Sequence, residues 1–281
     1  MIDISQQELQ VIANYIYEIC GVKLDKSKEY LIKTRLDQIL IEQQCATYSE
    51  LYYKARLDLS GKLNSLIINA ITTPETLFFR DSHPFDILKQ IVLPELLERK
   101  KNTGSQLLPT HLRIWSAACS TGQEIYSIAM CLKDTIPDLS KMRVTLLATD
   151  ISDSVLSIAK EGKYNQFEIS RGLAKDKLNK HFVQSDNTWQ VNENIRKMIT
   201  FQKRNLMQPF MGVGPFDIVF CRNVAIYFTI EDRIKLFNKI ADVIELGGYL
   251  FIGSSEFLTG ICDRFTAIRH QKSIYYQLTS K

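Results

Sequence analysis

The chain has 281 residues, 45% of them hydrophobic, and a formal net charge of +4. It can therefore bury a full core, in one large domain or two unequal ones, and it is not a disordered protein. The small charge gives no general case for nucleic-acid binding, and no run of about 18 or more apolar residues predicts a membrane span. The cysteines and histidines are dispersed without CxxC pairs, so we expect reduced thiols, no metal site and a cytoplasmic location.

Helices are predicted up to residue 72. Ser5 and Glu8 have the spacing of a capping box, and apolar residues then recur at helical spacing as far as Gly21. A second amphipathic helix, over about 26–39, has a mostly positive polar face, and such a face is more often solvated than functional. Its basic residues are Lys26, Lys28, Lys33 and Arg35. With further helices at 48–56 and 59–71, residues 1–72 are predicted to form a small all-helical domain.

Residues 73–90 are predicted to form a connector that folds onto the rest of the chain. Pro74 and Pro84 flank the cluster Phe78-Phe79-Arg80, and free linkers are seldom so aromatic. A helix over about 85–101 follows. The connector therefore joins the helical domain to a second domain without acting as a flexible tether.

The stretch from Arg113 to Met130, RIWSAACSTGQEIYSIAM, changes its period in the middle. A buried strand is predicted at its start and a helix from Gln123 onward, with small residues between them up to Gly122. Such a turn would let another molecule approach the backbone closely. Proteins of the α/β class hold nucleotide-like ligands in this way, over the helix N-terminus. Taken alone, the stretch is also compatible with an ordinary strand-to-helix turn.

A second apolar strand, at 143–149, ends in Asp150. An acid at the end of the second strand can accept hydrogen bonds from both ribose hydroxyls of a nucleotide. A lone Asp after a strand is more often a helix cap, and the helix predicted at 152–161 would give it that role. Together with the turn at Gly122, however, Asp150 favours a ligand site.

The remaining chain completes an α/β domain. Residues 164–204 depart from the regular alternation and are predicted to contain an inserted hairpin. A buried strand at 216–223, a helix over 230–246 that ends at Gly247-Gly248, and a strand at 249–256 come next. Two short strands at 265–269 and 273–278 are predicted to close the sheet as an antiparallel pair. The fold class is thus α/β, with a mostly parallel sheet covered by helices on both faces.

Four stretches in this order resemble one family: TTPETLFFR, RIWSAACSTGQEIYSIAM, LLATDIS, and FDIVFCRNVAIYF followed by GGYLFIGSSEF. They are similar to the CheR-type chemotaxis receptor methyltransferases, which methylate glutamate side chains of chemoreceptors with S-adenosylmethionine. The resemblance runs over nearly the whole chain. It implies a Rossmann-like class I methyltransferase domain at 91–281, an N-terminal helical domain, and a β-subdomain inserted at about 164–204.

The resemblance also implies a set of site residues. Arg80 and Tyr227 match catalytic positions near the sulfonium methyl and the incoming carboxylate. The positions that match the cofactor pocket are Thr76, Arg80, Gly122, Glu124, Asp150, Asn205, Leu206, Arg222 and Asn223. The chain departs from the family pattern at Pro74, Gln123 and Ile125, which leaves Pro74 and Gln123 doubtful as contacts.

The implied partners are the cytoplasmic domains of chemoreceptors. Their methylation regions present acidic helices, so Lys26, Lys28, Lys33 and Arg35 become candidate substrate-binding residues. By the resemblance, members of the family that bind a receptor-tail peptide carry a longer, glycine-containing loop in the β-subdomain. The loop VQSDNTWQ is short and lacks glycine, so we do not expect this chain to need the peptide, and we expect a monomer. Two alternatives stay open: a methyltransferase for another substrate, and a cofactor-binding sensor or scaffold without turnover. The sequence CRNV, in place of an Asn/Asp-Pro-Pro-aromatic run, argues against methylation of nucleic-acid bases.

Overall fold

The computed structural model describes residues 3–103, 109–271 and 273–280, with the side chains of Lys26 and Thr103 excepted. The predicted capping box is present: Glu8 N donates to Ser5 Oγ at 3.2 Å, and Ser5 N donates to Glu8 Oε2 at 3.0 Å. The helix that it starts ends at Gly21, as predicted. The second predicted helix is preceded by a short 3-10 turn, η1 (Lys26–Lys28). The helices of the N-terminal domain are α1 (Gln6–Cys20), α2 (Glu29–Glu42), α3 (Tyr48–Leu57) and α4 (Lys62–Ile71).

The helix predicted at 85–101 is present, but it is interrupted by a π-helical turn. It consists of α5 (His83–Ile87), the π turn η2 (Leu88–Val92) and α6 (Leu93–Thr103). Pro94 has no N–H to donate to the carbonyl four residues earlier, so a regular α-helix would be broken there. The π turn, in which Leu93 N donates to Leu88 O, carries the helix past this point.

The main sheet has seven strands in the described part of the chain, in the order β6-β2-β1-β7-β8-β10-β9. Strand β10 is antiparallel to both of its neighbours, β8 and β9, and the other pairings of this sheet are parallel. This confirms the predicted antiparallel closing pair. The strands are β1 (Thr110–Ala117), β2 (Met142–Asp150), β6 (Ile199–Lys203), β7 (Phe216–Cys221), β8 (Ile244–Ile252), β9 (Phe265–His270) and β10 (Ser273–Leu278).

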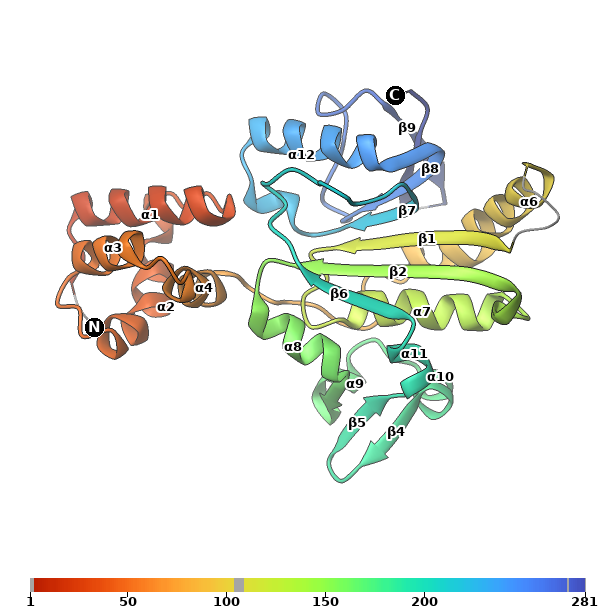
Figure 1. Ribbon diagram of the computed structural model, residues 1–281, viewed down its shortest axis with the longest axis horizontal. Helices are drawn as coiled ribbons and strands as arrows, with labels where there is room; N and C mark the ends of the chain where they lie inside the picture. Colours follow the sequence, from red (N-terminus) through yellow and green to blue (C-terminus); the bar gives the residue numbers. More distant parts are fainter. Residues whose placement is uncertain (1–2, 104–108, 272, 281) are drawn as a thin grey trace.

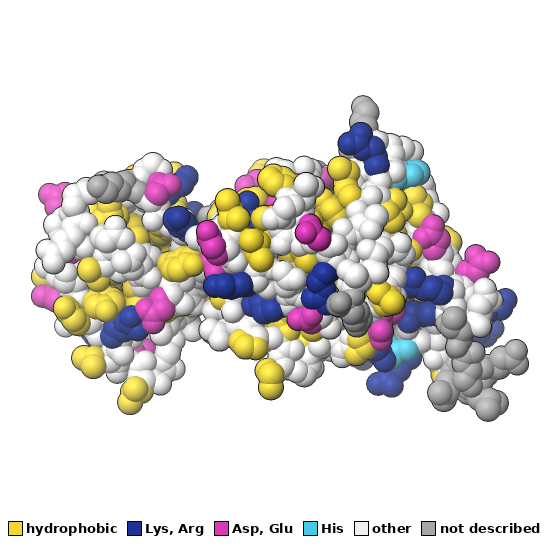
Figure 2. All heavy atoms as spheres, turned by 90° about the horizontal axis from the view of Figure 1, so that it is seen from above, with side chains coloured by type: hydrophobic (Ala, Val, Ile, Leu, Met, Phe, Trp, Pro, Cys, Tyr) yellow, Lys and Arg dark blue, Asp and Glu magenta, His cyan; other side chains and the backbone are white. Residues whose placement is uncertain are grey.

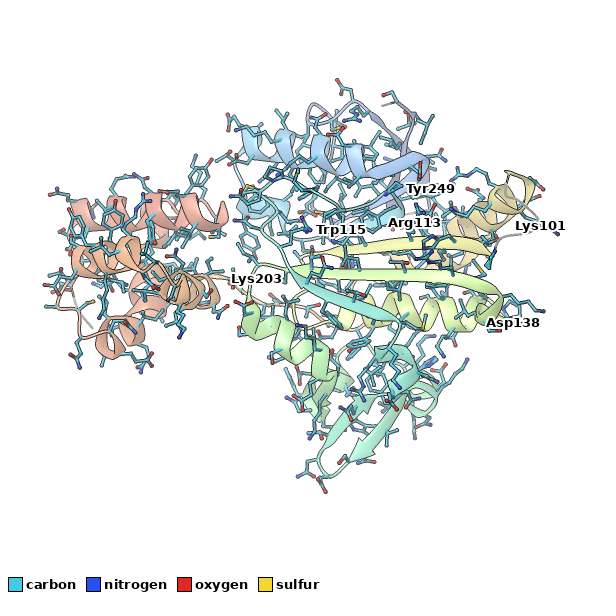
Figure 3. All side chains as sticks on the ribbon, viewed as in Figure 1. Lys101, Arg113, Trp115, Asp138, Lys203 and Tyr249 are labelled. Carbon is cyan, nitrogen blue, oxygen red and sulfur yellow. The ribbon has the colours of Figure 1, made fainter. Side chains whose placement is uncertain are left out.

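Helices cover both faces of this sheet, as predicted (Figure 1). One face packs against the run α5 to α6, α7 (Gln123–Thr135) and α8 (Asp153–Glu161). The other face packs mainly against α12 (Ile230–Val243). Trp115 of β1 is fully buried on the α12 side, where its Nε1 donates to Thr149 Oγ1 at 3.0 Å (Figure 3).

The predicted end of the helix before β8 is wrong. The sequence predicts an end at Gly247-Gly248, but α12 ends at Val243 and β8 begins at the next residue. The glycines instead lie within β8, where the pairing with β7 shifts register between Phe216 and Ile218. Gly247 has a φ of 76°, which fits a strand irregularity as well as a helix terminus. A glycine pair alone therefore does not distinguish the two.

The inserted segment forms a small sheet of its own, with strand order β3-β5-β4. The last strand of the range predicted for the insertion, β6, pairs in parallel with β2 in the main sheet. The elements of the insertion are β3 (Lys163–Asn165), α9 (Gln166–Ser170), α10 (Lys175–His181), β4 (Phe182–Ser185), β5 (Thr188–Val191) and α11 (Glu193–Arg196).

The helical domain lies beyond the carboxyl ends of the parallel strands, and the two domains meet at a narrow waist (Figures 1 and 2). The C-terminal end of α1 makes much of the contact. A Cβ on Gly21 would lie 2.6 Å from Met207, so the bare backbone allows this approach. Lys23 N donates to Tyr227 O at 3.0 Å, and Lys203 at the end of β6 reaches Ser65 Oγ at 3.0 Å (Figure 3). Over the described ranges, no helix has the length and apolar character needed to cross a membrane.

Candidate functional site

A cavity of about 680 Å³ lies between the helical domain and the carboxyl edge of the main sheet. Its walls come from residues 20–35 and 71–80, and from the segments that follow β1, β2, β6 and β7. In open α/β sheets, ligands bind at this edge, where the loops after neighbouring parallel strands meet. The volume is also in the range of small-molecule sites, about 300–1,000 Å³.

The turn after β1 lines the cavity, but not through the predicted glycine. Ala118 and Ser120 form this wall and have φ values of 63° and 51°. Gly122 is not among the lining residues, and a Cβ there would lie 3.0 Å from Ala159 Cβ and 3.1 Å from Tyr164 Oη. The glycine is therefore needed for packing against α8. The expectation that Gly122 admits the cofactor is not supported by this geometry.

Asp150 faces the cavity from the end of β2. Its Oδ2 accepts from Ser120 N at 2.9 Å, and its Oδ1 accepts from Ser152 N at 3.0 Å. Burial raises the pKa of the carboxyl group, while the backbone donors act in the opposite direction. The N-cap of α8 is Ser152, whose side chain accepts from Val155 N, so Asp150 does not have the alternative role of helix cap.

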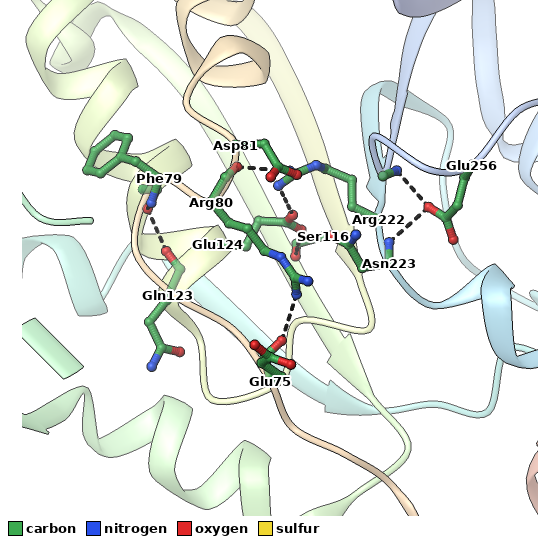
Figure 4. A network of polar contacts seen from close by, with 12 residues as sticks. Glu75, Phe79, Arg80, Asp81, Ser116, Gln123, Glu124, Arg222, Asn223 and Glu256 are labelled. Carbon is green, nitrogen blue, oxygen red and sulfur yellow. Dashed lines mark hydrogen bonds and ion pairs between the residues drawn. The ribbon is translucent and has the colours of Figure 1, made fainter. Parts of the chain in front are cut away.

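Arg222 and Glu124, both predicted cofactor contacts, line the cavity and bond to each other in its wall (Figure 4). Arg222 Nη1 donates to Glu124 Oε2 at 3.0 Å, and Glu124 Oε1 accepts from Ser116 Oγ at 2.7 Å. Arg222 Nη2 donates to Asp81 Oδ2 at 2.8 Å. The Arg222 side chain is only 1% exposed, so this charge needs the two carboxylates as partners. The cluster fixes the position of the wall before any ligand binds.

Arg80 and Tyr227, the predicted catalytic pair, line the same cavity from different segments. Arg80 lies in the connector, and its Nη1 donates to Glu75 O at 2.8 Å (Figure 4). Tyr227 is 40% exposed and belongs to η4 (Ala225–Tyr227), the short turn after β7. The fold thus places at one cavity two residues that are 147 positions apart in the sequence.

The other predicted cofactor contacts also line the cavity. They are Thr76, Asn205, Leu206 and Asn223. Asn205 links the two domains, because its Nδ2 donates to Ile19 O at 2.9 Å. Asn223 has a φ of 58°, and its N–H donates to Glu256 Oε2 at 2.9 Å. Of the two doubtful positions, Pro74 lines the cavity, whereas the buried Gln123 does not and accepts from Thr121 Oγ1 at 2.7 Å.

The predicted substrate-binding residues do not form one surface. Lys28 is exposed and lines the cavity, but Lys33 is absent from the lining and pairs with Asp3 at 3.2 Å. Arg35 lines the cavity, yet its Nη1 donates to Ala70 O at 2.9 Å and to Thr72 O at 3.1 Å. Arg35 thus ties α2 to the end of α4, which the amphipathic pattern did not indicate. The side chain of Lys26 lies outside the described residues.

Sequence reasoning missed Asp81, Ser116 and Glu256, which hold the site residues in place. Asp81 directly follows Arg80, so its position in the sequence was a usable signal. Ser116 and Glu256 gave none, because a serine inside an apolar strand and an acid in a loop are common in any protein.

A mostly parallel sheet with an antiparallel closing pair, a cavity at its carboxyl edge and an acid after the second strand place the chain in the class of α/β proteins that bind nucleotide-like ligands. Residues 74–274 match the family model described as CheR methyltransferase, SAM binding domain, and residues 7–72 match CheR methyltransferase, all-alpha domain. The chain belongs to the CheR methyltransferase family, and its cofactor is S-adenosylmethionine.

Curated relatives cover nearly the full chain. Chemotaxis protein methyltransferase 1 of Pseudomonas aeruginosa is 37% identical over 96% of this chain and 97% of its own length. Chemotaxis protein methyltransferase Cher2 of Pseudomonas putida is 37% identical over 94% of each chain. The chemotaxis protein methyltransferase of Vibrio parahaemolyticus is also 37% identical, over 99% of this chain and 98% of its own.

Proposed function

We propose that this protein transfers a methyl group from S-adenosylmethionine to glutamate side chains of chemotaxis receptors, giving glutamate methyl esters. The observation that carries the proposal is that Arg80 and Tyr227 line the same cavity as Asp150. Arg80, which can bind a carboxylate, and Asp150, which can bind ribose hydroxyls, thus line the same cavity. The relatives' names, which refer to chemotaxis, support the choice of substrate.

The residues around the cavity fit S-adenosylmethionine. Asp150 uses one lone pair on each oxygen for a backbone N–H, and a carboxylate has about four lone-pair sites in all. It can therefore accept two further hydrogen bonds, from the ribose hydroxyls. The small side chains of Ala118, Cys119 and Ser120 leave room for the cofactor against the backbone. The rest of the proposed contacts come from other residues that line the cavity: Thr76, Arg80, Glu124, Asn205, Leu206, Arg222 and Asn223.

When bound, the cofactor supplies an electrophilic methyl group on a sulfonium. The carboxylate that accepts it needs no general base, because the reference pKa of glutamate is about 4.3 and the group is ionised at neutral pH. The protein must instead align the nucleophile and exclude water, and alignment alone can contribute roughly 7 to 11 kcal/mol.

Arg80 is the proposed residue for this alignment. A guanidinium stays cationic and offers two parallel donors to a carboxylate, so it can hold the group without protonating it. Arg80 Nη1 contacts a backbone carbonyl, that of Glu75, and a neutral acceptor can be exchanged for a charged one. Tyr227, in the turn η4 after β7, limits the directions from which the substrate oxygen approaches.

The substrate is proposed to enter beside the helical domain. Lys28 is exposed at the cavity and can attract an acidic receptor helix, whereas Lys33 and Arg35 already have partners. We propose that the reaction takes place in the cytoplasm, on the cytoplasmic domains of the receptors. We further propose that the protein acts as a monomer and does not require a receptor-tail peptide.

The test is to incubate the protein with methyl-labelled S-adenosylmethionine and purified chemoreceptor cytoplasmic domains. We expect base-labile label on receptor glutamates, and the same receptor with those glutamates replaced by alanine is the control. Cofactor binding without transfer to any receptor would favour a sensor or scaffold. Label on another class of molecule would instead identify a different substrate.

A further inference from the structure

The turn that carries Arg80 has an unusual backbone. Phe79, Asp81 and Ser82 have φ values of 51°, 63° and 27°, a region that residues other than glycine rarely adopt. Such conformations persist only where the surrounding structure determines them, and they are common at functional sites. The turn at residues 79–82 must therefore be held by specific contacts.

The strongest of these contacts come from Arg222. Its Nη2 donates to Arg80 O at 2.9 Å and to Asp81 Oδ2 at 2.8 Å, so one nitrogen binds two groups of the turn (Figure 4). The other terminal nitrogen, Nη1, is anchored on Glu124 in the wall. The Arg222 side chain is 1% exposed, so its donors are shielded from water, whereas the Asp81 carboxylate that accepts from it is 37% exposed.

The Asp81 carboxylate is the charged part of this connection. Both bonds from Arg222 Nη2 are charge-assisted, but only the bond to Asp81 adds the attraction between two opposite charges. On the other side of the turn, Phe79 N donates to Ser127 Oγ at 3.0 Å. The Arg80 guanidinium, by contrast, contacts Glu75 O on the connector itself. Its direction therefore depends on the backbone of the turn.

We infer that Asp81 is a positioning residue for Arg80, because through Arg222 it holds the turn in the conformation that directs Arg80 into the cavity. The inference rests on the proposed function, in which Arg80 aligns the carboxylate. A merely structural Asp81 would affect stability alone. A positioning Asp81 also affects turnover, and only when Arg80 is present.

The test is a double-mutant cycle with Asp81→Asn and Arg80→Ala. Asparagine keeps the shape of Asp81 and tolerates its φ of 63°, so mainly the charge is lost. We expect Asp81→Asn to lower turnover by about tenfold in the wild-type background, with the affinity for S-adenosylmethionine changed less than about twofold. In the Arg80→Ala background it should cause no further loss. Additive losses, or wild-type turnover in the single variant, would overturn the inference.

A second variant and a second measurement do not depend on the receptor. Asp81→Gly also allows the positive φ and removes the acceptor completely, so it should reduce turnover more than Asp81→Asn. In both variants, hydrogen exchange at the amide of Ser82, which donates to Phe79 O at 2.8 Å, should become faster. The matched control is Asp86→Asn, in a half-exposed pair with Lys89. Unchanged exchange in the Asp81 variants would refute the inference even if no receptor is methylated.

Discussion

The two walls of the cavity differ in how their polar groups are satisfied. On the sheet side, Arg222, Glu124 and Asp150 are largely buried, and each has a hydrogen-bond partner in the protein. On the helical-domain side, Lys28 is exposed and Tyr30 is 63% exposed. Both walls line the same cavity. The sheet wall is fixed by its own contacts, whereas the helical wall keeps Lys28 and Tyr30 exposed to a second molecule, although its Arg35 is held by backbone carbonyls.

This difference suggests a division of tasks. Preorganised groups are effective toward a ligand that always has the same structure, such as a cofactor. Exposed and adaptable side chains suit a variable protein surface, where charge mainly affects the rate of encounter and specificity. Substitutions in the sheet wall should therefore affect turnover or cofactor affinity, and those in the helical wall should affect the receptor KM.

The largest effect is expected at Arg80, which is proposed to contact both the cofactor and the substrate carboxylate. Arg80→Ala should lower the turnover number for receptor methylation by about 100-fold or more, because the carboxylate loses its alignment. Cofactor affinity, measured by calorimetry, should fall by much less. If single-turnover methylation by this variant matched the wild-type rate, Arg80 would have no role in alignment.

Asp150→Ala should weaken binding of S-adenosylmethionine by roughly 10- to 100-fold. Hydrogen bonds to charged groups contribute about 1.5 to 3 kcal/mol each, and this carboxylate faces the cavity. Calorimetry gives the dissociation constant. Asp153→Ala, three residues further along and paired with Lys203 on the surface, is the control. Equal affinities of wild type and Asp150→Ala would remove Asp150 from the cofactor site.

The pH dependence of cofactor binding should also reflect Asp150. Its ionised form accepts the ribose hydroxyls, so affinity is complete above the pKa of the free protein and falls as the pH decreases through it. Because burial raises this pKa, the affinity should begin to fall at a higher pH than for an ordinary carboxyl near 4. A single protonation should lower the affinity by at most about tenfold per pH unit. Asp150→Asn should bind weakly and show a flatter profile. The same decrease in Asp150→Asn would assign the titration to another group.

The smallest effect is expected on the helical wall. Lys28→Glu should raise the receptor KM by about two- to fivefold at low ionic strength, since it replaces an attractive rim charge with a repulsive one. Added salt should reduce the difference. Steady-state methylation rates measure it, with the exposed Lys62→Glu in the same domain as control. An unchanged KM would mean that the receptor does not contact this wall.

Local signals in the sequence were sufficient for much of the fold. The capping box at Ser5 and Glu8, the strand that ends at Asp150, and the closing pair of strands all depend on neighbouring residues, so their patterns could be recognised. The glycines at 247 and 248 were misassigned because positive φ serves both a helix end and a strand irregularity.

The site was less predictable wherever a side chain's role depends on a distant segment. Arg35 looked like part of a basic face, but it binds carbonyls at the end of α4. Gly122 looked like a ligand turn, but the space beside it is occupied by Ala159 and Tyr164. Asp81 acquires its role only because Arg222, 141 positions later, is folded against it. No local pattern encodes such pairings.

The contact between the α1 terminus and η4 limits how freely the two domains can be exchanged among relatives. Lys23 N–H donates to the carbonyl of Tyr227, and Gly21 packs against Met207 and Phe228. A chimera that takes its helical domain from another member must therefore also match these contacts. Otherwise the exchanged domain would also change the surroundings of Tyr227. An effect on turnover could then be mistaken for an effect on receptor recognition. The two domains match separate family models, but residues of both line the cavity.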